Sequence, residues 1–265
     1  MIPRRTFLAL TAVSAAFAQD DTDRITVPFS DPSGAKRISC SLIHGSITVK
    51  VHSGKDAIVE AKARGVRSRR EPPPGMRRIG NTATGPTVEE SGNSIRVVAS
   101  HSRTADVTLH VPADTSVKLN TVNSGHILVE GLSGEIDANN INGNITVNNV
   151  SGAVVAHTLN GKLIVSLQQI TPNKAMSFST LNGNVDVTLP ATTQANLKMK
   201  SENGEIFSDF EIALKPTSQP AQESKSQDGK RYRVRFDKAM YGSINGGGPE
   251  MQFTTLNGTI YIRKK

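Results

Sequence analysis

Glycine recurs every nine residues across the middle of the chain, and this period constrains the fold more than any other feature. Each of these glycines follows an Asn or a Ser and precedes apolar residues two and four places later. Such alternation predicts a short strand with one buried face. Each unit is therefore expected to be a strand followed by a corner. The glycines of the unbroken period are Gly125, Gly134, Gly143, Gly152 and Gly161.

Two kinds of structure could contain these units. Asn-Gly and Ser-Gly pairs are typical of two-residue hairpins between antiparallel strands. A solenoid explains the constant apolar phase better, because each strand stacks on its equivalent in the next coil about 4.8 Å away. Asn and Ser largely alternate before the glycines, which indicates two strands per coil. The sequence predicts an all-β fold, a single right-handed parallel β-helix, with almost no helix outside an N-terminal signal.

The corners extend beyond the regular period. An early copy at His44-Gly45 and a later one at Asn245-Gly246 follow the same pattern, and insertions lengthen the later coils. Asn tolerates the left-handed conformation, and its amide can stack in ladders or bond local backbone. We therefore predict a structural role for the corner residues. They are Gly125, Gly134, Asn142, Gly143, Gly152, Asn160, Gly161, Asn182, Gly183, Asn203, Gly204, Asn257 and Gly258.

Residues 1–18 have the features of an export signal. Arg4 and Arg5 give a basic start, an apolar run begins at Phe7, and Ala16-Phe17-Ala18 fits a cleavage site. The start also matches part of the twin-arginine motif, although a general secretory signal fits equally well. The apolar run is shorter than the ~20 residues that span a bilayer, so no transmembrane segment is expected. We predict export to the periplasm or the cell surface.

The mature chain, residues 19–265, is expected to be one β-solenoid domain. Two segments rich in Pro or polar residues interrupt the pattern, at about 65–92 and 215–230. They are predicted to project as loops. The final strand ends in Arg-Lys-Lys, and these charges would discourage another chain from pairing with an exposed edge there.

Three segments carry a resemblance to a known family. They are "HGSITVKVHSGKDAIVEAKA" at 44–63, "VTLHVPADTSVKLNTVNSGHILVEGLSGEI" at 107–136 and the closing "GSINGGGPEMQFTTLNGTIYIRKK". With the repeat, they resemble DUF4097, a family of bacterial adhesin-like domains of unknown function. The resemblance implies a parallel β-helix, an envelope or surface location and a non-catalytic binding or scaffold role. It transfers no functional residue, because the family has no established site.

A polysaccharide hydrolase or lyase is the alternative from a different class. Glycoside hydrolysis needs two carboxylates about 5 to 9 Å apart, which stacked coils could supply. Asp137 and Asp186 are the leading candidates, but the acidic residues near the pattern occupy different strand offsets as a set, and no column of Arg or Lys joins them. We expect a solvated face without enzyme activity. The other acidic residues near the pattern are Glu130, Glu135, Glu205 and Asp209.

No metal or cofactor site is indicated. The six histidines lack paired ligand spacing, and one cysteine cannot form a zinc cluster or an intramolecular disulfide. Cys40 lies in an alternating stretch and is expected to be a buried small side chain. The chain has no Trp, so a sugar-stacking site is not predicted. Phe207, Phe210 and Phe253 are expected to pack in the core.

A basic excess favours anionic partners. The net charge is +8 at pH 7, which suits acidic polysaccharide or an envelope surface, whereas an exported chain without a binding motif argues against nucleic acid. An envelope protein is the other expected partner, and a sensory or assembly role is equally compatible.

Arginine binds carboxylated or sulfated polymers through paired hydrogen bonds, although a solvated loop without a ligand is the alternative. The candidate patch is Arg64, Arg67, Arg69, Arg70, Arg77 and Arg78.

Overall fold

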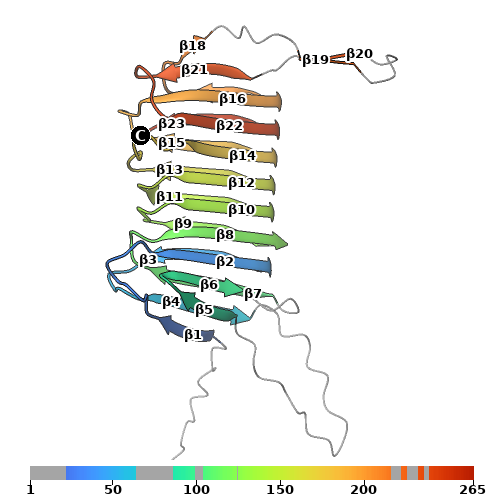
Figure 1. Cartoon of the computed structure of the whole chain (residues 1–265). Coiled ribbons are helices and arrows are strands. Elements are labelled where there is room, and N and C mark those ends of the chain that lie inside the picture. The colour runs from blue at the N-terminus through green and yellow to red at the C-terminus, as the bar shows by residue number, and fades with distance from the viewer. Residues whose placement is uncertain are drawn as a thin grey trace, which may run out of the picture.

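The protein is an all-β stack of strands in the part of the chain that the structure describes (Figure 1). The structure is a computed structural model, and the described ranges contain strands, turns and bends but no helix, and so none that could cross a membrane. The all-β prediction is confirmed. The predicted signal at 1–18 lies outside these ranges. The described residues are 22–63, 86–98, 104–123, 125–215, 222–225, 232–235 and 239–265.

The strands form two large mixed sheets and one small sheet. Sheet A has ten strands and sheet B eleven. The spatial order of sheet A is β1 (Thr22–Val27), β4 (Ala57–Ala63), β7 (Ala105–Val111), β3 (Ile47–Val51), β9 (Ile127–Glu130), β11 (Ile145–Val150), β13 (Leu163–Leu167), β15 (Val185–Leu189), β23 (Ile260–Lys264) and β17 (Ile206–Ser208).

Sheet B lies opposite sheet A, with the core between them. β19 (Gln222–Lys225) and β20 (Tyr232–Arg235) form the separate antiparallel pair. The spatial order of sheet B is β18 (Ala213–Lys215), β21 (Met240–Ile244), β16 (Ala195–Asn203), β22 (Glu250–Asn257), β14 (Met176–Asn182), β12 (Val154–Asn160), β10 (Ile136–Asn142), β8 (Ser116–Asn123), β2 (Arg37–His44), β6 (Ser94–Val98) and β5 (Thr87–Ser91).

Each nine-residue unit forms one strand, and successive units alternate between the two sheets. β10 in sheet B leads into β11 in sheet A, and β12 and β13 repeat the step. β10 and β12 pair in parallel with Ile136 opposite Val154. β11 and β13 pair in parallel with Ile145 opposite Leu163. Both offsets are eighteen residues, as the two-strand coil requires.

Both ends of the stack depart from uniform parallel pairing. The last coil, β22 and β23, is inserted between β14–β15 and β16–β17 rather than following them in space. β4 pairs antiparallel with β7, β5 with β6 and β21 with β16. The expectation of parallel strands throughout is therefore wrong at the ends. The expected exposed edge at the final strand is also wrong, because β23 lies inside sheet A and β17 is the edge strand.

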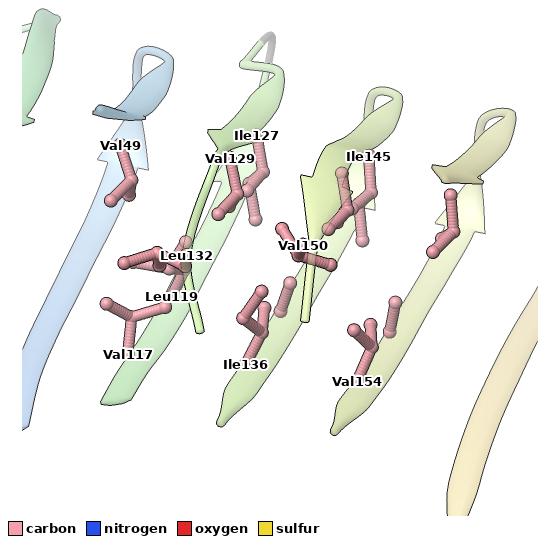
Figure 2. Close-up of a cluster of buried hydrophobic side chains, with 14 of the residues drawn as sticks. Val49, Val117, Leu119, Ile127, Val129, Leu132, Ile136, Ile145, Val150 and Val154 are labelled. Carbon is pink, nitrogen blue, oxygen red and sulfur yellow. The ribbon is translucent and has the colours of Figure 1, made fainter. Parts of the chain in front are cut away.

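One continuous hydrophobic core fills the space between the sheets (Figure 2). Alternate residues of each strand point inward, such as Val154 and Ala156 of β12. Phe178 of β14 and Phe253 of β22 are fully buried, with ring centroids 5.2 Å apart. Burial of one large apolar side chain contributes about 1.5 to 3 kcal/mol. Because every coil adds an equivalent layer, stability accumulates along the stack.

The corners are joined by an internal column of hydrogen bonds. Thr158 points inward, and its Oγ1 donates to the backbone oxygen of Gly143 in the preceding coil at 2.9 Å. A side chain at Gly161 has no room, because a Cβ there would overlap that same oxygen. Glycine is required at this corner by close packing of backbone on backbone. The equivalent donor and glycine pairs are Thr121–Gly45, Asn140–Gly125, Thr180–Gly161, Thr255–Gly183 and Ser201–Gly258.

A second column runs along the outside of the same corners. Asn160 Nδ2 donates to Asn142 Oδ1 at 2.9 Å, and Asn182 Nδ2 donates to Asn160 Oδ1 at 2.7 Å. These amides are exposed, and they form the kind of ladder that the sequence predicts. Asn123, Asn257 and Asn203 extend the column.

Three local features differ from the sequence-based expectation. The amide of Asn245 donates to the backbone oxygens of Ala191 and Thr193 and does not join the column. It follows the antiparallel strand β21, so the predicted solenoid corner there is wrong. β5 lies within the loop predicted at 65–92, and β19 lies within that predicted at 215–230. Both segments therefore contain strand.

Removing one rung of the outer column tests its contribution to stability. Asn160→Ala deletes two amide hydrogen bonds, and a net intramolecular hydrogen bond contributes about 0.5 to 1.5 kcal/mol. We expect the free energy of unfolding to fall by about 1 to 2 kcal/mol, measured by urea denaturation. Asn148→Ala is the control, because that side chain lies outside the column. Equal stabilities for the two variants would contradict a structural role for the ladder.

Candidate functional site

A shallow groove of about 510 Å³ lies where the central strands of sheet B begin. It crosses the first residues of β2, β8, β10 and β12, where neighbouring coils enter this sheet. The parallel register places Lys118 beside Asp137 and Asp137 beside Val155 on the outer face. Val155 is 43% exposed and gives the groove an apolar surface. The charged residues of the groove are Arg37, Lys118, Glu135, Asp137 and Lys174.

Each carboxylate in the groove has a lysine partner. Lys174 Nζ lies 2.8 Å from Glu135 Oε1, and Lys118 Nζ lies 3.2 Å from Asp137 Oδ2. Asn139 Nδ2 also donates to Asp137 Oδ1 at 2.7 Å. The hydrogen bond from Lys174 lowers the pKa of the Glu135 carboxyl below its usual value, and the positive charges add to this effect. Glu135 is therefore held as a carboxylate, which makes it a poor proton donor.

Arg37 is the unmatched cation of the groove. It begins β2, is exposed, and lies opposite Ser94 and Ser116 in the neighbouring strands. Its charge contributes to the lowered pKa of Glu135, but less than Lys174 does. Within the described ranges it forms no ion pair. An anionic group that enters the groove can therefore bind Arg37 without displacing a carboxylate of the protein.

The structure does not bring the two leading catalytic candidates together. Asp137 lies in β10 of sheet B and Asp186 in β15 of sheet A. Both alternate with buried neighbours, so each faces outward from its own sheet. The two carboxylates therefore point to opposite sides of the stack. Glu135 precedes β10 in sheet B, whereas Glu130, Glu205 and Asp209 belong to or flank strands of sheet A.

Sheet A contains a stack of side chains that the sequence analysis missed. β17, β23 and β15 are neighbours, which places Phe207, Tyr261 and Asp186 in one outward row. The rings of Phe207 and Tyr261 stack with centroids 5.7 Å apart. Arg263 lies over the Tyr261 ring at 5.1 Å and donates to both oxygens of Asp186 at 2.7 and 3.1 Å. Phe207 is 49% exposed, so its predicted core position is wrong.

A signal for this stack was present in the sequence. Asp186, Tyr261 and Phe207 each lie three residues after the glycine of an Asn-Gly corner. The Asn-Gly corners of the outer Asn column lead into sheet A, so residues at this offset share one face. The spatial neighbours could not be inferred, because the last coil is inserted out of chain order. Phe210 and Phe253 are buried as expected.

The remaining predicted residues form no reactive site in the described part of the chain. Cys40 is buried, and desolvation raises the pKa of its thiol to about 12, so the thiol is inert. His157 Nδ1 lies 2.8 Å from Ser179 Oγ, and His52 Nε2 lies 2.7 Å from the backbone oxygen of Asp56. No group of three or more His, Cys, Asp or Glu in the described ranges could hold a metal ion.

The predicted arginine patch lies outside the described residues. Its members are Arg64, Arg67, Arg69, Arg70, Arg77 and Arg78. The basic residues whose surroundings the structure describes are therefore those of the groove and of the strands.

Comparisons with known proteins match one family. The model of the family described as Toastrack DUF4097 matches residues 25–238. No curated protein matches the chain.

Two crystal structures are similar in fold. A "putative cell adhesion protein" from Clostridium sporogenes has a TM-score of 0.48 and 11% identity, over 92% of this chain and 100% of that chain. A "putative adhesin" from Bacteroides fragilis has a TM-score of 0.41 and 11% identity, over 92% of this chain and 97% of that chain. Similarity at this level transfers no function.

The ion pair in the groove makes a prediction about titration. Lys174→Ala should raise the pKa of Glu135 toward the usual value of about 4.3, because the hydrogen bond that stabilises the carboxylate is lost. In the unchanged protein the lowered pKa means that the pair is intact above the usual pKa and is lost as pH falls through the lowered pKa. Carboxyl-detected NMR titration measures the pKa of Glu135 in the unchanged protein and in the variant. Lys118→Ala, which removes the partner of Asp137, is the control; an unchanged Glu135 pKa in Lys174→Ala would contradict the assignment.

Proposed function

We propose that the chain, which belongs to the Toastrack DUF4097 family, is a non-catalytic binding or scaffold module of the cell envelope. The features of residues 1–18 support export to the periplasm or the cell surface. The central coils support the finer description as a right-handed parallel β-helix with Asn-Gly and Ser-Gly corners. Crossovers between parallel strands of one sheet are right-handed in about 98% of cases.

The groove on sheet B is the proposed binding site, and an acidic polysaccharide is the proposed ligand. The unmatched charge of Arg37 carries this proposal. Lys118 and Lys174 are balanced by Asp137 and Glu135, so an added carboxylate or sulfate would gain most from Arg37. A guanidinium binds such groups through two parallel hydrogen bonds. The regular outer face of a solenoid also suits an extended polymer.

Binding without cleavage fits the groove better than hydrolysis does. A glycosidase needs a carboxylic acid with a raised pKa to protonate the leaving group. The pKa of Glu135 is lowered instead, and Asp137 is held by Lys118 and Asn139. The second leading candidate, Asp186, faces the opposite side and is bound by Arg263. These contacts disfavour the polysaccharide-acting enzyme considered as the alternative.

Retention on immobilised polysaccharide tests the proposal. The mature chain, residues 19–265, should be retained on a carboxylated or sulfated polysaccharide and released as salt is raised, because charge pairs between exposed groups are screened. Arg37→Ala should elute at lower salt than the unchanged protein. Lys162→Ala is the matched control, because it removes one positive charge at an exposed corner of sheet A.

The outcomes separate the candidate functions. Equal elution of the Arg37→Ala and Lys162→Ala variants would show that net charge, and not the groove, governs retention. New reducing ends in the polysaccharide after incubation would contradict the non-catalytic assignment. No retention of the unchanged protein on any acidic polysaccharide would reject this ligand class.

A further inference from the structure

Three of the four ends of the two large sheets finish in antiparallel strands within the described ranges. β4 and β1 lie beyond β7, and β5 lies beyond β6. β21 and β18 lie beyond β16. The fourth end is β17, which is parallel to β23 and has no described strand on its other side. β1, β5 and β18 are edge strands too, so β17 differs from them in its parallel pairing, and the side chains along each edge decide which one suits a partner.

On the side of β17 that faces away from β23, no strand of the described part of the chain pairs with the backbone. Ile260 N donates to Glu205 O at 3.0 Å, and Asp209 N donates to Ile262 O at 2.9 Å. Backbone groups of successive strand residues point in alternate directions, so the N–H and C=O of Ile206 and Ser208 face away from β23. These groups are available to another strand.

An aromatic ring with one free face marks the same edge. Phe207 stacks on Tyr261 of the preceding strand at an interplanar angle of 18°. Neighbouring strands follow one another along the stack, so the other face of the 49% exposed Phe207 ring is directed beyond the edge. Tyr261 is itself backed by Arg263, which is fixed by Asp186. The ring is therefore held in place, which reduces the entropy lost when a partner binds.

The edge is acidic. Glu205, Asp209 and Glu211 are all exposed along β17 and the segment that follows it. On the neighbouring strand, Arg263 binds Asp186, and its charge also acts on Asp209. Asp209 Oδ2 accepts a hydrogen bond from Lys264 N at 3.3 Å. Glu205 and Glu211 form no ion pair within the described ranges. A second copy of β17 would bring the same acidic residues opposite one another, and like charges across strands destabilise pairing. The charge therefore favours a basic partner over self-pairing of this edge.

We propose that the open edge of β17 binds an extended, basic segment of a partner protein, with an aromatic side chain facing Phe207. Strand addition uses backbone hydrogen bonds for affinity and alternate side chains for specificity. It uses the backbone groups on the outer side of β17 together with the free face of the Phe207 ring, whereas a sugar ring would use the ring face alone. This site lies in sheet A, apart from the groove in sheet B, and extends the proposed function to a protein partner.

A short synthetic peptide tests this site on the full chain. The sequence TRVFTRT places its Phe opposite Phe207 and its two Arg residues opposite Glu205 and Asp209 when it pairs with β17. Fluorescence anisotropy of the labelled peptide should show saturable binding. Phe207→Ala should weaken it about two- to tenfold, the range expected for loss of one aromatic pair. The control is Ile164→Ala, which removes a 42% exposed side chain from the same outward row and should leave binding unchanged.

Two N-methylated peptides separate strand addition from simple attraction. In one peptide the backbone amides of the second, fourth and sixth residues are methylated. In the other peptide those of the third, fifth and seventh residues are methylated. Only one set of amides faces β17, so one peptide should lose binding and the other should retain it. Equal affinities would overturn the proposal, because a charged peptide held without backbone pairing would not distinguish them.

Other occupants give different outcomes, each of which overturns the proposal. Absence of peptide binding together with Phe207-dependent retention on a glycan would assign the ring to sugar binding. Phe207-dependent dimerisation in sedimentation experiments, without peptide binding, would assign the edge to a second copy of the chain.

Peptide binding that Arg37→Ala leaves unchanged would support an edge site independent of the groove, so failure at one site is distinguishable from failure at the other.

Discussion

The close stacking of backbone at the corners is the constraint on which the rest of the structure depends. The backbone oxygen of Gly143 accepts a hydrogen bond from Thr158, and Gly161 lies so close to it that no side chain fits. Repetition of this contact stacks corner on corner, with an offset of eighteen residues between β10 and β12 and between β11 and β13. Once the offset is fixed, the inward positions repeat apolar side chains, apart from the polar donors of the internal column, and the outward positions form rows.

Outward rows explain how this fold makes sites. Residues from successive coils become neighbours through register, as Lys118 and Asp137 do in sheet B and Phe207 and Tyr261 do in sheet A. Groups placed in this way lie along an extended surface and do not converge in a deep pocket. In the groove, the pairing of each carboxylate with a cation favours charge recognition over proton transfer. The free edge adds backbone hydrogen bonding, a different means of recognition at a different place.

The sequence predicts the central coils well because their information is local. A glycine and its flanking residues specify one strand and one corner, and equal spacing specifies the stacking partner. The ends are different, because the insertion of β22 and β23 and the antiparallel strands depend on pairing between distant segments. The outward position of Phe207 follows from its place three residues after Gly204, but its stacking on Tyr261 depends on the inserted coil. Asp137 and Asp186 both lie three residues after a corner glycine, so the local pattern places both on an outer face, but only the strand pairing assigns them to different sheets.

Disulfide trapping measures the offset between coils most directly. Thr146 and Ile164 are register partners on the outer face of sheet A, and neighbouring strands about 4.8 Å apart lie within the Cα range of about 4.4 to 6.8 Å for a disulfide. In a Cys40→Ala background, Thr146→Cys with Ile164→Cys should oxidise to an intramolecular disulfide. Thr146→Cys with Ser166→Cys, shifted by two residues, should remain reduced under the same conditions. Preferential oxidation of the shifted pair would contradict the eighteen-residue register and the account built on it.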